Sequence, residues 1–285
     1  MLIDYDTVEE FNQENLRILD YVLKLKHIFI QEAVSGKLLP QNPNDEPASE
    51  LLKAIDRNRL EKEVSKNFLQ LPIDNSEEPY KLPLGWVWTR FGNIEFKSNT
   101  GLERNRDQQS EDNAYEYFKM NNIGIAGDCI LEDKVRVNAT DEEIKRNRLQ
   151  NGDFLFNTRN SRELVGKTCV INSIENRTIL FNNNILRTKF LGGIEPNWVN
   201  LWFCSNEATK IKQKLISSTT NVAAIYQNQL RNFLVPLSPL NEQKLIIKKI
   251  NYLIGLCGEI QERINRNMND STMLIGTILN EAFNF

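Results

Sequence analysis

The chain has 285 residues, of which 40% are hydrophobic and 9% aromatic, and this composition is typical of a folded protein with its own core. Its formal net charge of −3 argues against a protein that coats nucleic acid without selectivity. No run approaches the roughly 18 uninterrupted apolar residues of a membrane helix, and the first residues lack the pattern of a secretory signal. We therefore expect a cytoplasmic protein that contacts no membrane.

Charge is distributed unevenly along the sequence. Residues 1–80 carry 9 basic and 16 acidic side chains, residues 81–235 carry 21 and 17, and residues 236–285 carry 5 of each. The middle of the chain is therefore the part suited to approach a phosphate backbone, whereas the acidic N-terminal part would avoid it or face a basic partner. An excess of this size also arises by chance.

The first predicted element is an amphipathic helix over residues 11–33, where apolar residues recur every three or four positions. Gly36 is suited to end it. After a turn rich in Pro, Asn and Asp, a second helix is expected to begin at Pro47 or Ser49 and to run to about residue 67. Residues 70–83, rich in Pro, Asp and Glu, are expected to form a linker.

The pattern changes over residues 86–235 to short apolar or β-branched runs separated by polar turns. Residues 134–137 alternate as a strand does, whereas residues 141–149 and 196–215 carry helical signals. We expect an α+β fold, with one mixed α/β domain built on a curved, irregular sheet and long helices on either side of it.

The last predicted element is a long helix that starts near Leu240. Its apolar residues follow the alternating spacing of four and three that is typical of a coiled coil: Ile246, Ile250, Leu253, Cys257, Ile260 and Ile264. The spacing is then offset by four across a stretch with several asparagines, which predicts a stutter or a local break. Such a narrow seam needs a partner helix. The candidates are the N-terminal helix, through Ile18, Val22, Leu25 and Phe29, and a second copy of the chain; packing on its own domain is the remaining alternative.

A polar cluster follows the strand-like run Phe154–Phe156. It contains Asn157, Arg159, Asn160 and Arg162, with Lys167 a little further on. Arginine bonds guanine O6 and N7, and asparagine pairs with adenine N6 and N7, so side chains of these types read base edges. The sequence therefore predicts a DNA-reading loop here. The alternative is a surface turn with a structural pair between Arg162 and Glu163.

Three further polar segments are candidate DNA contacts. Residues 97–113 contain Lys97, Asn99, Arg104 and Arg106; residues 217–230 contain Thr220, Asn221 and Gln227; and the asparagine-rich turn after residue 181 contains Asn183 and Arg187. Each has a plain alternative as an ordinary turn or a solvated loop.

Nothing in the residues indicates catalysis. The single histidine, His27, lies in the first predicted helix, and the four cysteines, at positions 129, 169, 204 and 257, include no close pair that suggests a metal or redox site. A methyltransferase would need a Gly-rich cofactor loop and an Asn/Asp-Pro-Pro-aromatic motif, and neither occurs in the sequence. We expect free thiols, no bound metal and no cofactor. A nuclease or methyltransferase and a non-DNA protein adaptor are the alternative functions.

The sequence resembles the specificity subunits of Type I restriction-modification systems. The resemblance is carried, in order, by IQEAVSGKLLPQNPNDEPASELLKAI (30–55), KLPLGWVWTRFGNI (81–94), FKMNNI (118–123), GDFLFNTRNSRELVGKT (152–168) and VPLSPLNEQKLIIKKI (235–250). Members of that family carry target recognition domains separated by helices that pair into an antiparallel coiled coil. They confer specificity on a methyltransferase and a translocating endonuclease without catalysing a reaction. This chain departs from the usual pattern because it has one recognition domain, where the typical member has two.

The resemblance implies a helical region over residues 1–80, a target recognition domain over 81–237 and a coiled-coil helix over 238–285. It implies double-stranded DNA, methyltransferase subunits and a restriction subunit as partners, with S-adenosylmethionine and ATP bound only by those other subunits. Two such chains would pair as a homodimer of half subunits, or the chain would be a truncated gene product. The DNA sequence and spacer length stay open.

Overall fold

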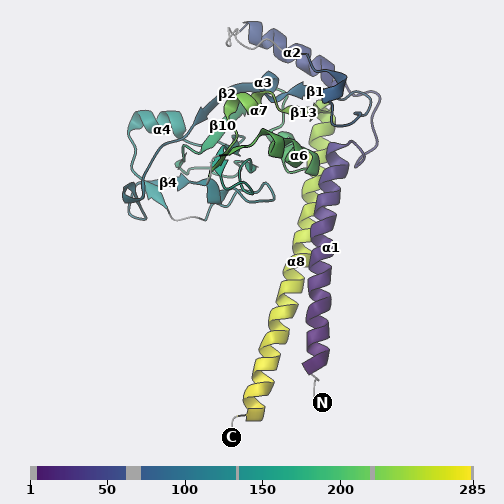
Figure 1. Ribbon diagram of the computed structural model, residues 1–285, viewed down its shortest axis with the longest axis vertical. Coiled ribbons are helices and arrows are strands. Elements are labelled where there is room, and N and C mark those ends of the chain that lie inside the picture. Colours follow the sequence, from purple (N-terminus) through teal and green to yellow (C-terminus); the bar gives the residue numbers. More distant parts are fainter. Residues whose placement is uncertain (1–4, 62–71, 133–134, 219–221, 284–285) are drawn as a thin grey trace.

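The computed structural model describes residues 5–61, 72–132, 135–218 and 222–283. Figure 1 shows a domain of mixed helices and strands at one end of a long two-helix rod. The rod consists of α1 (Tyr5–Val34) and α8 (Leu240–Phe283). The chain rises to the domain along α1, builds the domain, and returns along α8, so the two helices are antiparallel (Figure 1).

The contact between α1 and α8 buries a narrow apolar stripe. Its buried members are Val22 and Ile30 on α1 and Ile246, Ile250, Cys257 and Ile264 on α8. Lys26 donates a hydrogen bond to Gln261 at 2.5 Å across the contact, which marks the antiparallel register. The expected antiparallel coiled coil and the expected α+β fold class are confirmed.

Some apolar residues of the predicted seam lie outside this stripe. Ile18 and Leu25 on α1 and Ile260 on α8 are exposed, with 44% of Ile260 accessible, while Leu253 and Phe29 are half-buried. The reason is geometric, because two helices cover only one side of each other. The stutter does not break α8, which runs without interruption past its asparagines. Within the described residues, no helix is long and apolar enough to cross a bilayer.

α1 ends where the sequence predicts. Gly36 adopts a left-handed backbone, φ +70°, and the N–H of Lys37 returns to the carbonyl of Glu32 at 2.8 Å, the arrangement that often closes a helix. α2 (Ala48–Glu61) follows a turn and lies above the domain in Figure 1. The rest of the predicted second helix lies outside the described residues.

Part of the predicted linker packs against the domain and is ordered. It contains a short 3-10 helix, η1 (Asn75–Glu77), whose Glu77 pairs with Arg90 at 3.0 Å. Tyr80 donates from its hydroxyl to the carbonyl of Val34 at 2.7 Å, and its ring packs edge-on to Trp88 with 5.2 Å between centroids. These contacts attach the segment to both the end of α1 and the domain.

The strands at which the chain enters and leaves the domain pair with each other. β1 (Val87–Arg90) runs antiparallel to β13 (Leu234–Leu237), with Val87 opposite Leu237. Pro236 fits in β13 because, among the described strands, β13 pairs only with β1. α8 begins three residues after β13, so this ladder fixes where the rod starts.

Between these two strands the chain forms several small sheets. One sheet of four antiparallel strands has the order β2 (Glu95–Thr100), β10 (Ile185–Phe190), β6 (Phe154–Asn157) and β8 (Thr168–Val170). A second has the order β3 (Gln109–Ser110), β5 (Arg136–Val137), β4 (Tyr115–Phe118) and β9 (Ile179–Phe181), with β4 and β9 parallel. A third joins β11 (Ser217–Ser218), β12 (Ala223–Ala224) and β7 (Arg159–Asn160). A register shift between Lys189 and Phe190 interrupts β10, as expected of an irregular sheet.

Short helices cover and connect these sheets. They are α3 (Phe91–Ile94), α4 (Asp141–Asn147), α5 (Pro196–Phe203), α6 (Asn206–Leu215) and α7 (Gln227–Arg231), with 3-10 turns η2 (Arg106–Gln108) and η3 (Met120–Asn122). The helical signal over residues 196–215 is divided between α5 and α6 because the hydroxyl of Ser205 caps α6, accepting the N–H of Ala208 at 3.2 Å.

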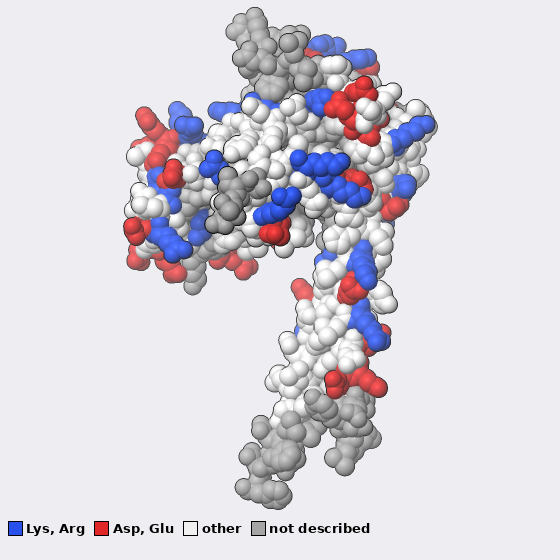
Figure 2. All heavy atoms as spheres, in the orientation of Figure 1, with Lys and Arg blue, Asp and Glu red and all other residues white. Residues whose placement is uncertain are grey.

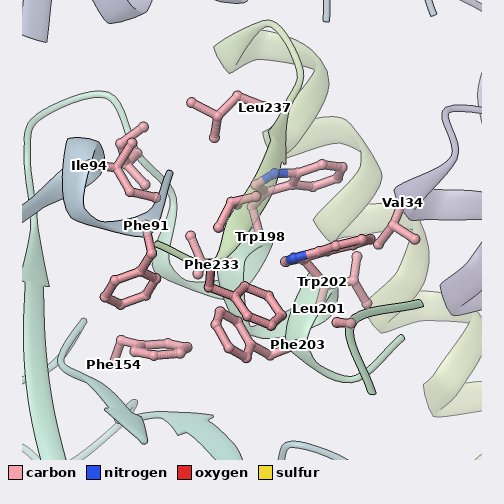
Figure 3. Packing of buried hydrophobic residues seen from close by; sticks show 14 of the residues in the cluster. Val34, Phe91, Ile94, Phe154, Trp198, Leu201, Trp202, Phe203, Phe233 and Leu237 are labelled. Atoms are coloured by element: carbon pink, nitrogen blue, oxygen red, sulfur yellow. The ribbon is translucent and has the colours of Figure 1, made fainter. Parts of the chain in front are cut away.

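An aromatic core connects the domain to the rod (Figure 3). Phe203 stacks on Phe233 with 4.6 Å between ring centroids. Trp198 and Trp202 on α5 donate their indole N–H groups to the carbonyls of Pro236 and Leu234, each at 2.8 Å. The same apolar cluster includes Val34 and Ile246, at the end of the rod that adjoins the domain. Domain and rod therefore share one core.

We predict that Phe203→Ala lowers the free energy of unfolding by about 3–5 kcal/mol, because it leaves a cavity among rings that the remaining side chains cannot fill. Phe203 is 1% exposed and packs against the rings of Phe91, Phe154, Phe156 and Phe233. Denaturant unfolding measures the change. Leu84→Ala is the control, since Leu84 is 87% exposed and should change stability by less than about 0.5 kcal/mol. Equal losses in the two variants would contradict this account of the core.

Candidate nucleic-acid interface

The predicted DNA-reading loop forms a compact turn over residues 157–168, which we call the recognition turn. β6 ends at Asn157, and Gly166 and Lys167 return beside it through backbone hydrogen bonds of 2.8 and 2.9 Å. Within the turn, β7 (Arg159–Asn160) pairs with β12. These ladders hold the turn at a fixed position on the domain.

Three predicted residues of the recognition turn lie at its surface. Arg159 and Arg162 are exposed, and neither guanidinium forms a hydrogen bond or ion pair with another described residue. Asn160 is half-buried, and its side-chain oxygen accepts the N–H of Ser161 at 2.8 Å. The pKa of Glu163 is lowered chiefly by its own backbone N–H and by Ser161, with Arg162 a smaller cause. The alternative of a structural Arg162–Glu163 pair therefore has no support within the described residues.

Asn157 differs from its neighbours and corrects the expectation for this position. Its side chain is fully buried and donates to the carbonyl of Leu164 at 3.2 Å, across the base of the recognition turn. Its side-chain oxygen is also buried and has no hydrogen-bond partner within the described part of the chain. An amide in this position holds the turn closed from inside, so we remove Asn157 from the surface that faces DNA.

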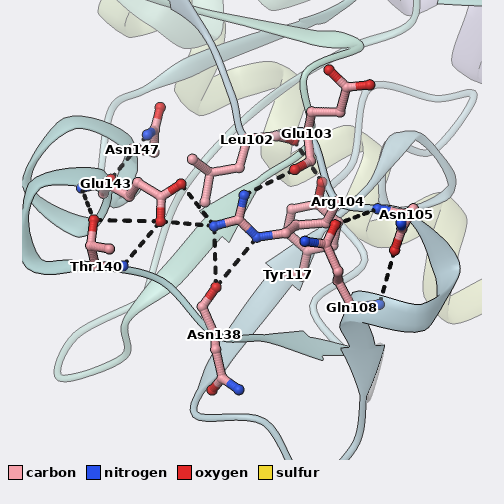
Figure 4. A network of polar contacts seen from close by, with 10 residues as sticks. All are labelled: Leu102, Glu103, Arg104, Asn105, Gln108, Tyr117, Asn138, Thr140, Glu143 and Asn147. Carbon is pink, nitrogen blue, oxygen red and sulfur yellow. Dashed lines mark hydrogen bonds and ion pairs between the residues drawn. The ribbon is translucent and has the colours of Figure 1, made fainter.

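Arg104, in the second candidate segment, is occupied by structural contacts (Figure 4). Its guanidinium donates to both carboxylate oxygens of Glu143 at 2.8 Å and to the carbonyl of Asn138 at 3.2 Å. The pKa of Glu143 is lowered, chiefly by this hydrogen bond and then by the backbone at Thr140. Arg104 thus fastens its loop to the start of α4. The loop is ordered, contrary to the solvated alternative, and the guanidinium is not available in this arrangement.

Arg187 and Asn99 are likewise used inside the domain. Arg187 is 7% exposed and donates to the side-chain oxygen of Asn99 at 2.7 Å and to the carbonyls of Arg146 and Arg148 at 2.8 Å. Its guanidinium also lies 3.5 Å from the carboxylate of the buried Asp153. Burial lowers the pKa of Arg187, and Asp153 opposes that effect. Both side chains join β2, β10 and the end of α4, which corrects their expected role at a DNA surface.

The remaining predicted residues are scattered. Lys97 and Arg106 are exposed, and Asn183 is half-buried. Gln227 donates to the carboxylate of Glu95 at 3.2 Å. Thr220 and Asn221 lie outside the described residues. Arg159, Asn160 and Arg162 therefore lie together on the recognition turn, whereas the other exposed candidates, Lys97 and Arg106, belong to a different segment of the chain.

A pocket of about 190 Å³ adjoins the recognition turn. Arg162, Glu163, Val165, Lys167 and Thr168 line it from the turn, and Thr209, Lys212, Gln213 and Ile216 line it from α6 and its end. Lys212 was not among the sequence candidates. The sequence did carry a signal for it: Lys212, Gln213 and Ile216 follow Thr209 by three, four and seven residues, a spacing that puts all four on one face of a helix.

The described residues offer no metal centre and little preference for one sign of charge. They contain no group of three or more His, Cys, Asp or Glu side chains arranged to hold a metal ion. All four cysteines are free thiols. On the face shown in Figure 2, basic and acidic side chains are interspersed over the domain. A DNA contact on this face would therefore depend on particular side chains and not on a broad basic surface.

Known proteins resemble this chain in sequence along almost its whole length. It is 25% identical over 308 residues to the Type I restriction enzyme EcoEI specificity subunit and 28% identical over 311 residues to the EcoAI specificity subunit, both of Escherichia coli. Each match covers 99% of this chain and 50% of the relative. The chain thus spans about half the length of these curated relatives. No family model matches the sequence.

Solved structures share the fold. One, described as the structural basis of complex assembly and conformational transition of the type I R-M system, has a TM-score of 0.55 and 19% identity and covers 95% of this chain and 59% of that chain. The HsdS subunit from Thermoanaerobacter tengcongensis has a TM-score of 0.50 and 17% identity over 96% of this chain and 57% of that one. At these identities the likeness establishes the arrangement of domain and rod alone.

We predict that Asn157→Asp lowers the free energy of unfolding by about 3 kcal/mol or more at neutral pH. The new carboxylate would be buried opposite the carbonyl of Leu164, where the amide now donates. Burial would raise the pKa of that carboxyl, so the loss should diminish as the pH falls and the group becomes neutral. Denaturant unfolding at two pH values measures it. Asn160→Asp makes the same change at the turn's surface and should cost less than about 0.5 kcal/mol; a similar loss there would contradict the distinction between the two asparagines.

Proposed function

The chain is related to the specificity subunits of Type I restriction enzymes over 99% of its own length, and from this premise we propose that it selects the DNA target of such an enzyme. In this proposal it binds double-stranded DNA and directs partner methyltransferase and restriction subunits to a target in two parts. The sequence relationship is the observation that carries the proposal. The placement of a polar turn on a domain that is mounted on a rod agrees with it.

The recognition turn is the part that we propose reads bases. Arg159 and Arg162 are exposed without an internal ion pair in the described structure, and Asn160 lies between them. Guanidinium and amide groups can form paired hydrogen bonds to guanine and adenine edges, and one such pair contributes about 1–3 kcal/mol of discrimination. The rigid ladders beneath the turn reduce the ordering cost of that contact. Lys97 and Arg106 are proposed to bind backbone phosphates, which position the protein without selecting a sequence.

We assign no catalytic step to this chain. Adenine methylation and DNA cleavage belong, in the proposal, to the partner subunits, which also bind S-adenosylmethionine and ATP. The single histidine, His27, is exposed on α1, far in sequence from the recognition turn. The proposed task is therefore to hold the catalytic subunits at a chosen site in the cytoplasm, and its measurable output is where methylation occurs.

The rod exposes apolar residues along both of its helices. Its exposed apolar residues are Phe11, Leu16, Ile18, Tyr21, Leu23, Leu25 and Ile28 on α1 and Leu245, Tyr252, Leu256, Ile260, Met273 and Leu274 on α8. Figure 2 shows uncharged surface between the charged side chains of the rod. Exposed apolar residues in this number are typical of protein interfaces. We propose that a second copy of the chain covers part of this exposed apolar surface and that methyltransferase subunits bind beside it.

A symmetric pair would constrain the DNA target. A two-fold axis between two copies imposes its symmetry on the site that both domains read. The two half-sites would then be identical and inverted, with a fixed gap set by the rods. A protein adaptor that does not bind DNA would also use the rod, but it would show no salt-dependent affinity for duplex DNA in the assembled complex.

We predict that coexpression with the neighbouring methyltransferase produces methylated adenines at one recurring motif of two inverted, identical half-sites. Genome-wide mapping of methylated adenines measures the motif, its gap and its symmetry together. Arg162→Ala should relax the preference at one position of each half-site by about 1–3 kcal/mol, or 5- to 150-fold in relative methylation. Leu84→Ala, distant in sequence from the turn, should leave the motif unchanged. Methylation without a shared motif would refute the function, and unlike half-sites would refute the symmetric pair.

We predict that the double substitution Leu256→Lys and Ile260→Lys converts a dimer to a monomer. These side chains are 38% and 44% exposed and lie one turn apart on α8, so one surface of the helix presents both. Burying a charge at an interface without a partner costs about 2 kcal/mol or more, which weakens the dimer at least about thirtyfold for each lysine. Analytical ultracentrifugation measures the change. Asn251→Lys, at an exposed position on the other flank of α8, adds the same charge as either substitution and serves as the control; a monomeric wild-type chain would exclude this use of the rod.

A further inference from the structure

The pocket beside the recognition turn contains an excess of positive charge. Arg162, Lys167 and Lys212 line it, and Glu163 is the single carboxylate among its described lining residues. Arg162 is at the exposed mouth, whereas the two lysines are half-buried. This combination distinguishes the pocket from the mixed surface around it.

The two lysines are held by backbone carbonyls. The ammonium of Lys212 donates to the carbonyls of Phe203 at 2.9 Å and Gly166 at 3.2 Å. That of Lys167 donates to the carbonyls of Met120, at 3.1 Å, and Ile123. Neither forms an ion pair with a carboxylate of the described residues. Each ammonium has three N–H groups, and the described residues accept from two.

Such cations are unfavourable in a folded protein unless something compensates them. Burial lowers the pKa of both lysines; Cys169 and then Asp128 oppose this for Lys167, and Cys204 opposes it for Lys212. Methionine or leucine would fill the same space on α6 without that cost. The one packing reason present is the position of Lys212 beside the ring of Phe203, 5.9 Å from its centroid. The carbonyls and the ring offset part of this cost, but no carboxylate of the described residues forms an ion pair with either lysine.

We infer that this pocket binds a phosphate group of the DNA backbone, with Lys212 and Lys167 supplying the charge. A phosphate oxygen would accept the third N–H of each ammonium, which is how lysine binds phosphate as a point charge. Thr209, Lys212, Gln213 and Ile216 present one face of α6 to the recognition turn.

This inference rests on the proposed function and adds a different kind of contact to it. Arg159, Asn160 and Arg162 would select bases, whereas Lys167 and Lys212 would bind the backbone of any sequence equally. Loss of the pocket should therefore weaken binding uniformly and leave the preferred motif unchanged. The opposite pattern would identify these lysines as base readers.

The test compares Lys212→Met with Lys214→Met in the full chain assembled with its methyltransferase. Lys214 is exposed on the same helix and outside the pocket, so the control removes the same charge. We measure the affinity for target and random duplexes by fluorescence anisotropy over a range of salt concentrations. Lys212→Met should reduce the salt slope by about one contact and weaken both duplexes by roughly eightfold near 0.1 M salt. Lys214→Met should leave the slope within experimental error of the wild type.

Two further measurements complete the test: a second lysine variant and the effect of inorganic phosphate on thermal stability. Lys167→Met, which removes the second charge, should reproduce the slope change without affecting α6. Inorganic phosphate, compared with chloride at equal ionic strength, should raise the melting temperature of wild type and Lys214→Met but not of Lys212→Met. A loss of affinity with an unchanged slope would show that Lys212 only joins α6 to the turn, and would overturn the inference. Stabilisation by phosphate without any binding of wild type to duplex would retain the anion site and refute the proposed DNA function.

Discussion

Indole hydrogen bonds from buried tryptophans hold the mixed helix-and-strand domain in a fixed orientation on its rod. Trp198 and Trp202 donate to carbonyls of β13, and Trp86 donates to the carboxylate of Glu242 in the first turn of α8, at 2.8 Å. A buried N–H without a partner is costly, so each ring can occupy only the position in which its acceptor is present. Because β13 leads directly into α8, these bonds set the angle at which the rod leaves the domain.

The cationic side chains of the domain divide into two groups. Arg90, Arg104 and Arg187 pair with Glu77, Glu143 and Asp153 and join segments that are distant in sequence. Arg159 and Arg162 have no such partner in the described structure and project from a turn that is itself held by two ladders. The net charge of a segment therefore says little about how many cations remain for a ligand. The internal pairs make the scaffold stiff, and the stiffness positions the few cations that are left.

The sequence was most informative where structure depends on local periodicity. The long helices, the left-handed glycine that ends α1 and the irregular character of the sheet all follow from spacing and turn residues. The division of α5 from α6 was also available, since Ser205 followed by Asn-Glu-Ala is a typical helix start.

The site was less accessible to the same reasoning, because it depends on contacts between residues far apart in the chain. Asn157 and Asn160 are alike in a sequence, and only the return of Leu164 beneath the turn buries one and leaves the other outside. Arg187 became structural through Asp153 and Asn99, and Lys212 entered the pocket because α6 packs against the turn. None of these partners is a sequence neighbour, so composition alone could not separate the two outcomes.

The ladder between β1 and β13 holds together the two ends of the chain segment that forms the domain. Four residues from each strand, Val87 to Arg90 and Leu234 to Leu237, form this ladder. A different polypeptide could be exchanged there if its ends have the same separation and if it supplies apolar side chains in the places of Trp198 and Trp202, which share a core with α1 and α8. Under the proposed function, a rearrangement between related genes that meets both conditions would alter the DNA target in one step and leave the rod unchanged.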